Sequence, residues 1–495
     1  MNPYSELLSI TPDEGFEFTK AMALADGPVD SSFWCDQPWL YSQVMAFLFR
    51  CLGYSPAIPR VLTTLLVLLM AFVLGARIDR RRWALWGAGV AFLCFTGPSG
   101  VTLSCSFLLE APAWALGMVA FSVPRLFTGR GPWLGALISG VLAACAVHTK
   151  PTALLVLPAC LVEVIIQSGV FSAVGSGNDG NCLPSRHALR ACAVWLLSAT
   201  VVFLAAMRIA PYWDWHRVLG THTQTLFALS GGNAAFRLDS AALLAHLDKL
   251  LLCLVAIVLA IRKQAIPEVA GSAVLVGSVV AAHAVVRPWW FHYQVHWTIA
   301  LSVLSLQGLK LLLDDPVADQ GTTVSAERRS PFVFATTIFC ALLWTSVLVF
   351  GVERMYADYS EVMNREHIGE SPILAKIVSY RDQSRWLFTP SRIYSFHSRI
   401  PIPPEVRWLS RKRFWSGQIS TANIIDTVKA YRPEQILLSH EETQMSEWSA
   451  ILTNGYSRVL LDAANQLWVR KDVATTYVSR MGSRPDARKD AGIIK

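Results

Sequence analysis

Ten long apolar stretches, separated mostly by short loops, constrain the fold of this chain more than any other feature. They run over 58–77, 83–98, 107–124, 133–149, 151–168, 191–209, 247–261, 268–286, 294–313 and 331–351. Each is long enough, or nearly so, to cross the roughly 30 Å hydrocarbon core of a bilayer as a helix. Hydrophobic residues make up 53% of the 495 residues and the mean hydropathy is +0.40, more than an ordinary soluble domain can bury. The sequence therefore predicts a multi-pass α-helical membrane protein with about ten spans.

Basic residues set the expected orientation of these spans, because loops rich in Lys and Arg stay in the cytoplasm. They gather in every second loop: Arg77, Arg80, Arg81, Arg82, Arg125, Arg130, Arg186, Arg190, Arg262, Lys263, Lys310, Arg328 and Arg329. The remaining loops, the residues before Pro59 and everything after about residue 352 are then expected on the other side of a cell membrane. In a bacterium that side is the periplasm.

The net charge of +8 does not predict a nucleic-acid partner. Much of the basic excess lies in the cytoplasmic loops, where it sets topology and contacts anionic membrane lipids. The ten cysteines fall mainly inside apolar spans without the spacing of metal ligands. Of these, only Cys35 and Cys51 are candidates for a disulfide on the outer side. We expect no nucleic acid, no metal and no cofactor.

The chain divides into three predicted parts. Residues 1–57 form an outer loop with an interfacial helix over 37–53, and residues 58–351 form the transmembrane domain. Residues 352–495 have the composition of a soluble domain and are expected outside the cytoplasm. There, short apolar runs at 386–390, 435–439, 458–462 and 466–471 alternate with helical patterns at 420–431 and 442–454. This alternation predicts a small α/β domain.

An acidic doublet, Asp13-Glu14, precedes the apolar stretches and is predicted to lie outside. It allows two interpretations. A carboxylate just before a helix caps its free amides, whereas carboxylates at the mouth of a membrane bundle often mark a functional site. No signal segment precedes the doublet to carry it across the membrane. Two explanations are open: the first span pulls the doublet across the membrane, or a further helix precedes it in the chain. We favour the second.

Further polar residues are predicted at the same outer face. Glu110 starts the third span, Lys150 lies at the turn between the fourth and fifth, and Arg287 ends the eighth. A carboxylate among apolar neighbours must be paired, hydrated or catalytic. Each basic residue taken singly is also explained by a side chain that extends to the interface. Together they predict a site where acids and bases meet.

An aromatic and histidine-rich segment follows Arg287. Trp289, Trp290, Tyr293 and Trp297 are typical of an aromatic belt at the headgroup level. His292 and His296 are four residues apart, which places them on one helical face at the separation of metal ligands. Because no third ligand is evident in the sequence, a phosphate-facing or interfacial histidine pair is favoured over a metal site.

These motifs, in this order, resemble those of the GT-C glycosyltransferases. They are Asp13-Glu14, the motif Asp36-Gln37-Pro38-Trp39-Leu40-Tyr41, Pro59-Arg60, Glu110 followed by Ala-Pro, Thr149-Lys150 and His292-Tyr293. The resemblance covers roughly residues 10–310. It is nearest to the dolichyl-phosphate-mannose protein mannosyltransferases and the bacterial aminoarabinose transferases.

The resemblance implies a polyprenyl-phosphate-sugar donor and a glycan, lipid or protein acceptor. It implies catalytic roles for Asp13, Glu14 and Glu110, and places Asp13 as the base. It further implies donor-phosphate binding by Lys150, His292 and Tyr293, and loop or acceptor contacts by Asp36, Gln37 and Arg60. Arg287, at the outer end of the eighth span, is a further candidate for the donor phosphate. His216 is a further candidate for loop or acceptor contacts, because it lies in a long outer loop, 210–246, and loops of that length tend to be functional. Two departures stand out: the helix that usually precedes the doublet is absent, and Gln37 replaces a Lys or His of some relatives.

The residues suit this chemistry on physical grounds. An acceptor hydroxyl that attacks an anomeric carbon needs one base, and the departing phosphate is already a stable anion. Nearby cations stabilise its growing charge, and a single displacement inverts the anomeric carbon. The alternative is a transporter or lipid flippase, which also places charged residues in the membrane, although usually near the midplane.

Overall fold

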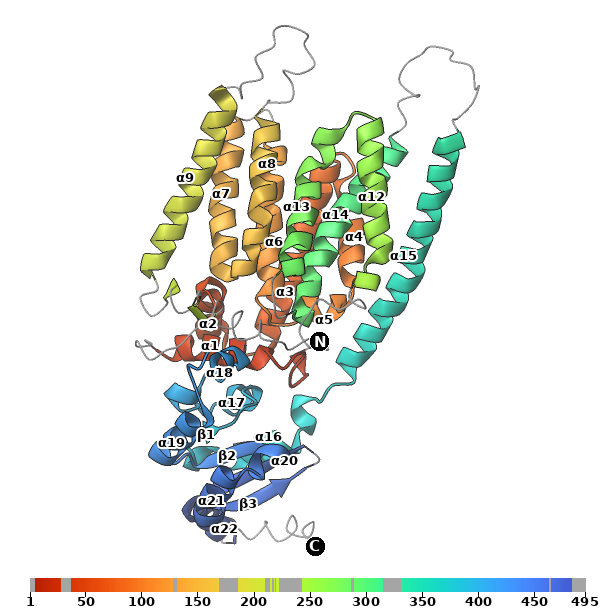
Figure 1. The fold of residues 1–495 in the computed structure, drawn as a ribbon. Coiled ribbons are helices and arrows are strands. Elements are labelled where there is room, and N and C mark those ends of the chain that lie inside the picture. The colour runs from red at the N-terminus through yellow and green to blue at the C-terminus, as the bar shows by residue number, and fades with distance from the viewer. Residues whose placement is uncertain are drawn as a thin grey trace, which may run out of the picture.

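The computed structural model describes residues 5–27, 37–127, 131–168, 186–209, 214–215, 218, 220–221, 243–285, 289–314, 331–462 and 464–482. These residues are mostly helical, with a bundle of long helices at one end and a small α/β unit at the other (Figure 1). Helices α1 (Glu14–Asp26) and α2 (Leu40–Leu52) lie between the bundle and the α/β unit.

Each of the ten apolar stretches predicted from the sequence contains a helix. These are α3 (Ala57–Ile78), α4 (Trp83–Phe95), α6 (Glu110–Leu126), α7 (Pro132–Thr149), α8 (Leu157–Gln167, preceded by the 3₁₀ turn η2, Pro151–Val156), α9 (Arg186–Ile209), α12 (Leu247–Arg262), α13 (Ile266–Val285), α14 (Gln294–Leu313) and α15 (Pro331–Met363). A short helix, α5 (Gly100–Cys105), links α4 to α6. Within the described residues, six helices are long and apolar enough to cross a membrane by themselves. The count of ten spans therefore stays a prediction.

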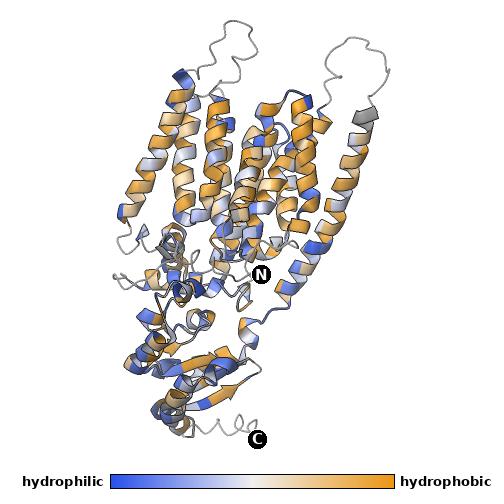
Figure 2. Ribbon diagram, in the orientation of Figure 1, coloured by the Kyte–Doolittle hydropathy of each residue, from blue (hydrophilic) through white to orange (hydrophobic). Residues whose placement is uncertain are grey.

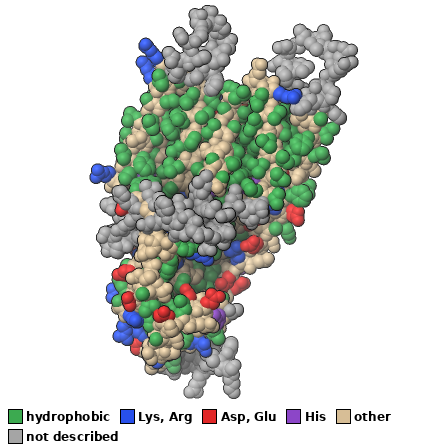
Figure 3. Space-filling model, in the orientation of Figure 1, with side chains coloured by type: hydrophobic (Ala, Val, Ile, Leu, Met, Phe, Trp, Pro, Cys, Tyr) green, Lys and Arg blue, Asp and Glu red, His purple; other side chains and the backbone are tan. Residues whose placement is uncertain are grey.

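The outer surface of the bundle is apolar, as a helix bundle in a bilayer requires. Figure 2 shows hydrophobic residues along the helices of the bundle, and Figure 3 shows hydrophobic side chains on its surface, with charged ones on the α/β unit and at the opposite end. Leu254 and Leu342 are 60% and 65% exposed, which is unfavourable unless hydrocarbon covers them. Helix α2 buries Met45 and Phe49 but exposes Phe47. This two-faced pattern fits the interfacial helix that the sequence predicts.

Close packing and one buried ionic cluster hold the bundle together. At Gly75 of α3 a Cβ atom would lie 2.7 Å from the Cα of Gly87, so only glycine lets α3 and α4 approach this closely. Near the end of the bundle far from the α/β unit, the buried Glu163 carboxylate pairs with Arg77 Nη2 and Arg125 Nε, both at 2.7 Å. The two cations offset the cost of burying the carboxylate.

The α/β unit contains a four-stranded sheet in the order β1-β2-β4-β3. β1 (Leu387–Phe388) pairs parallel to β2 (Gln435–Ser439), and β4 (Asn465–Arg470) pairs antiparallel to β2 and to β3 (Tyr456–Leu461). The strands fall on the apolar runs that predicted them. The helices of the unit are α16 (Pro372–Ser379), α17 (Ile393–Ser398), α18 (Arg411–Trp415), α19 (Thr421–Tyr431), α20 (His440–Thr443), α21 (Ser446–Gly455) and α22 (Lys471–Gly482). Since α15 continues to Met363, the domain boundary predicted at residue 352 lies within a helix.

Candidate active site

Three helix ends bring Glu110, Lys150 and His292 together at the end of the bundle nearest the α/β unit. Glu110 begins α6, Lys150 follows the last residue of α7, and His292 lies in the 3₁₀ turn η4 (Phe291–Tyr293) before α14. Pro151 disfavours a helical conformation at the residue before it. Lys150 is accordingly extended, with φ −154° and ψ 135°, and α7 ends there.

The Glu110 carboxylate is the centre of this group, which we call the Glu110 cluster (Glu110, Lys150 and His292). Its Oε1 forms an ion pair with Lys150 Nζ and lies 3.1 Å from His292 Nε2. Glu110 is 1% exposed, whereas the side chains of Lys150 and His292 keep 12% and 11% of their surface. The carboxylate therefore holds two nitrogen-bearing groups at the edge of the site, where a ligand can reach them.

Aromatic and histidine side chains back the Glu110 cluster. The Trp290 ring stacks on His292, and the Tyr293 ring packs on His283 and His296. His296 does not join His292 but lies with its Nδ1 atom 2.9 Å from His283 Nε2. Among the described residues, no group of three His, Cys, Asp or Glu side chains is placed to hold a metal ion.

The two carboxylates of the doublet have different environments. Glu14 is fully buried, and its carboxylate accepts hydrogen bonds from Arg60 Nη2 at 2.9 Å and from Arg60 Nε at 3.2 Å. It also accepts the backbone N–H groups of Ile10 at 2.6 Å and Phe107 at 2.7 Å. Phe107 lies three residues before Glu110, so this network anchors the doublet beside the start of α6.

Asp13 is partly exposed at the N-cap position of α1, but its side chain makes no capping hydrogen bond. Its charge interacts with that of Arg392 in the α/β unit, whose guanidinium lies 4.0 Å from the ring centre of the nearby Phe16. Burial lowers the pKa of Arg392 to about 9, and Arg413 acts in the same direction, whereas Asp13 opposes the shift. Gly15 permits this contact, because a Cβ atom there would lie 2.8 Å from the backbone nitrogen of Ile393.

The other predicted residues are placed as follows. Arg60 is 1% exposed and donates hydrogen bonds to the Glu14 carboxylate and to the carbonyl of Leu7, so it anchors the doublet. Gln37 is buried just before α2. Asp36, His216 and Arg287 lie outside the described residues.

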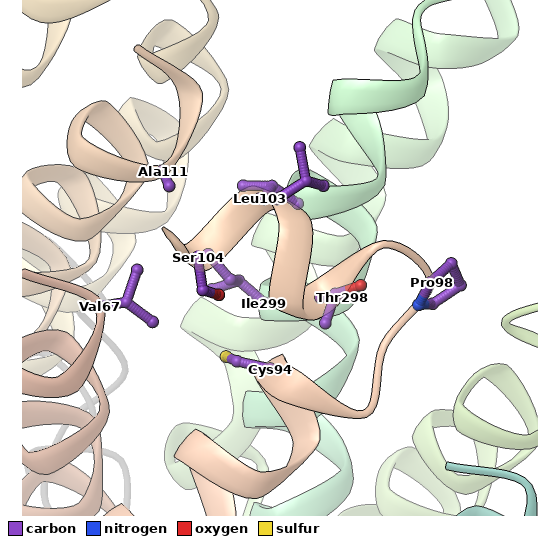
Figure 4. A pocket seen from close by; sticks show the side chains of 10 residues that line it. Val67, Cys94, Pro98, Leu103, Ser104, Ala111, Thr298 and Ile299 are labelled. Atoms are coloured by element: carbon purple, nitrogen blue, oxygen red, sulfur yellow. The ribbon is translucent and has the colours of Figure 1, made fainter. Parts of the chain in front are cut away.

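The cavities lined by described residues near this end of the bundle include a small one and a large one. One, of about 20 Å³, is lined by Ala111, Cys94 and Thr298 among others, and Figure 4 shows how these side chains surround it. It has room for about one water molecule and no room for a sugar. The other, about 570 Å³, is an open groove between α12 and α15. Neither is lined by Asp13, Glu110 or Lys150.

Comparison with solved structures identifies the fold. ArnT from Cupriavidus metallidurans bound to undecaprenyl phosphate matches with a TM-score of 0.57 and 12% identity, over 94% of this chain and 95% of ArnT. The apo form of the same protein gives a TM-score of 0.56. The chain has a GT-C-type fold. The archaeal oligosaccharyltransferase AglB from Archaeoglobus fulgidus matches with a TM-score of 0.50 and 9% identity, over 90% of this chain and 67% of AglB.

The GT-C resemblance inferred from the ordered motifs is therefore confirmed at the level of the fold. No protein-family model and no curated protein sequence matches the chain. The likeness lies in the arrangement of helices and not in overall sequence identity.

Sequence reasoning missed the contribution of the α/β unit to this face. Arg392 lies beside Asp13, and Lys412 and Trp415 of α18 lie beside His292 and Trp290. The only local signal was the basic run Arg411-Lys412-Arg413 followed by Phe-Trp. Nothing in that run indicates which surface it packs against.

Proposed function

We propose that this protein is a membrane glycosyltransferase that moves a sugar from a polyprenyl-phosphate donor to an acceptor on the extracytoplasmic side. The observation that carries the proposal is the Glu110 cluster at the end of a GT-C-type bundle, beside the anchored acidic doublet. The matching structures support the donor class, because ArnT was solved with undecaprenyl phosphate and AglB with a dolichol phosphate and an inhibitory peptide.

In this proposal Lys150 binds the donor phosphate and Glu110 positions it. An ammonium group has three donor positions, and the ion pair with Glu110 fixes its direction. His292 is held by the same carboxylate oxygen and adds a second nitrogen to the phosphate site. Charge stabilisation of this kind is largest where water is excluded.

Asp13 is proposed as the general base. The acceptor hydroxyl oxygen attacks the anomeric carbon, the bond from that carbon to the phosphate oxygen breaks, and its electron pair stays on the phosphate. The hydroxyl proton passes to Asp13. Because the hydrogen-bond positions of Glu14 are taken by Arg60 and two backbone amides, we assign Glu14 a positioning role.

The topology follows from the same assignment. The end of the bundle that carries the Glu110 cluster, together with the α/β unit, is proposed to face away from the cytoplasm. The basic loops at the opposite end are proposed to face the cytoplasm. A transporter is the weaker alternative, because these ionisable groups gather at one end of the bundle and not at midplane on broken helices.

The test is transfer of a labelled sugar from polyprenyl-phosphate donors by the purified full chain and by Asp13→Asn. Asparagine is nearly isosteric but cannot accept a proton, so the rate is expected to fall about 100- to 10,000-fold. Asp26→Asn, at the exposed far end of α1, is the matched control and should keep the parent rate. A folded Asp13→Asn protein that transfers sugar at the parent rate would exclude Asp13 as the base.

A further inference from the structure

Helix α18 of the α/β unit lies against the Glu110 cluster. The Trp415 ring of α18 stacks on Trp290 with 6.0 Å between ring centres and 22° between planes, and Trp290 stacks on His292 at 6.2 Å and 12°. A hydrogen bond from Gln418 Nε2 to Thr221 Oγ1, at 2.8 Å, fixes the residues after α18 to the segment that precedes α12. The stack of three rings therefore sets the position of α18 relative to His292.

The three basic residues of α18 do different things. Arg411 is exposed to solvent. Arg413 points back into its own unit, where its Nη1 donates to the carbonyls of Trp408 at 2.9 Å and Glu405 at 3.4 Å. Lys412, unlike Arg411, is partly buried, and it lies about one helical turn before Trp415, which stacks on Trp290. Of the three, Lys412 is thus the one that this packing brings toward the cluster, in agreement with the effect of its charge on the His292 imidazole.

A phosphodiester donor carries one negative charge, and Lys150, held by Glu110, is the first cation placed to meet it. When the sugar leaves, the phosphate becomes a monoester with a second developing charge, and a second lysine then stabilises it more than the starting donor.

We propose that Lys412 is a donor-binding residue supplied by the α/β unit, which contacts the phosphate together with Lys150, and that Trp415 positions it. The inference rests on the proposed function and extends it: the active site is completed by two parts of the chain about 260 residues apart in sequence (Lys150 and Lys412). The α/β unit is then part of the catalytic apparatus.

The experiment measures steady-state transfer from a polyprenyl-phosphate-sugar donor and, separately, the binding of polyprenyl monophosphate to the full chain in detergent. Lys412→Gln is expected to weaken monophosphate binding and to lower kcat/KM for the donor, each about 10- to 100-fold, as for loss of a charge-assisted hydrogen bond. Lys412→Arg keeps the charge and should recover most of both. Arg411→Gln removes a neighbouring charge of the same helix and should change neither.

Trp415→Ala separates positioning from contact. It keeps the Lys412 ammonium group but removes the stack on Trp290 that positions it, so it should weaken monophosphate binding less than Lys412→Gln does. Melting temperatures of all variants show whether each is folded.

The outcomes distinguish the two proposals. If the parent protein transfers sugar and a folded Lys412→Gln protein binds monophosphate with parent affinity, the role of Lys412 is overturned and the proposed function stands. If the parent protein binds monophosphate in a Lys412-dependent way but transfers no sugar, the donor-binding role is supported and the proposed reaction fails. If the parent protein does neither, both proposals fail.

Discussion

The ion pair between Glu14 and Arg60 offers the sharpest test of how the acidic doublet is organised. Both side chains are at most 1% exposed, and Glu14 Oε2 lies 2.9 Å from Arg60 Nη2. Glu14→Gln removes the negative charge and leaves a buried guanidinium without its counterion. Removal of one partner from a buried pair typically costs about 3 to 5 kcal/mol.

The assay is thermal unfolding of the purified chain in detergent, with Glu6→Gln as the control for an exposed carboxylate in the same segment. We expect Glu14→Gln to lower the melting temperature by several degrees and Glu6→Gln to leave it unchanged. Arg60→Met alone leaves the buried Glu14 carboxylate without its counterion. The double variant Glu14→Leu with Arg60→Met should therefore lose less stability than the sum of the losses of the two single variants. A melting temperature of Glu14→Gln equal to that of the parent would refute the structural role assigned to this pair.

Three further predictions concern other contacts. Gly15→Ala places a Cβ atom 2.8 Å from the Ile393 backbone nitrogen, so it should loosen α1 from α17 and lower activity, whereas Gly27→Ala, where no atom lies within 4 Å, should not. Burial lowers the pKa of His397 from 6.5 to about 4, and the hydrogen bond from His397 to the Leu8 carbonyl opposes this shift. The neutral imidazole therefore stabilises the fold fully above pH 6.5, and this stabilisation is lost as the pH falls toward 4. When the pH falls from 6.5 to 5, the free energy of unfolding of His397→Gln should therefore decrease by about 2 kcal/mol less than that of the parent, as measured by unfolding at both pH values. An equal decrease in both proteins would contradict the assignment. Glu163→Gln leaves Arg77 and Arg125 without their shared carboxylate and should destabilise by about 3 to 5 kcal/mol, unlike Glu268→Gln, whose side chain is 50% exposed.

The helices and part of the candidate site could be predicted from the sequence because both follow from the bilayer. Apolar length predicts where a helix can cross, and alternation of crossings places every second helix end at the same face. That reasoning placed Glu110, Lys150 and Arg287 at one face, and His292 entered through the segment that follows Arg287. The structure joins Glu110, Lys150 and His292 through a single carboxylate oxygen.

The remainder depends on contacts between residues far apart in the chain. Asp13 and Glu14 are adjacent and chemically alike, but Glu14 is bound to Arg60, 46 residues away, and to the Phe107 amide, 93 residues away. No local pattern separates the two roles. The docking of α18 on Trp290 is likewise a tertiary contact, which the basic run at residues 411–413 does not encode.

The most direct test of the account is an experimental structure of the full chain with a bound polyprenyl phosphate. The account predicts a phosphate within hydrogen-bond distance of Lys150 Nζ, beside His292 and Lys412, with the Asp13 carboxylate facing the same space. A phosphate bound instead in the open groove between α12 and α15, or beside Arg77 and Arg125 at the far end of the bundle, would contradict it.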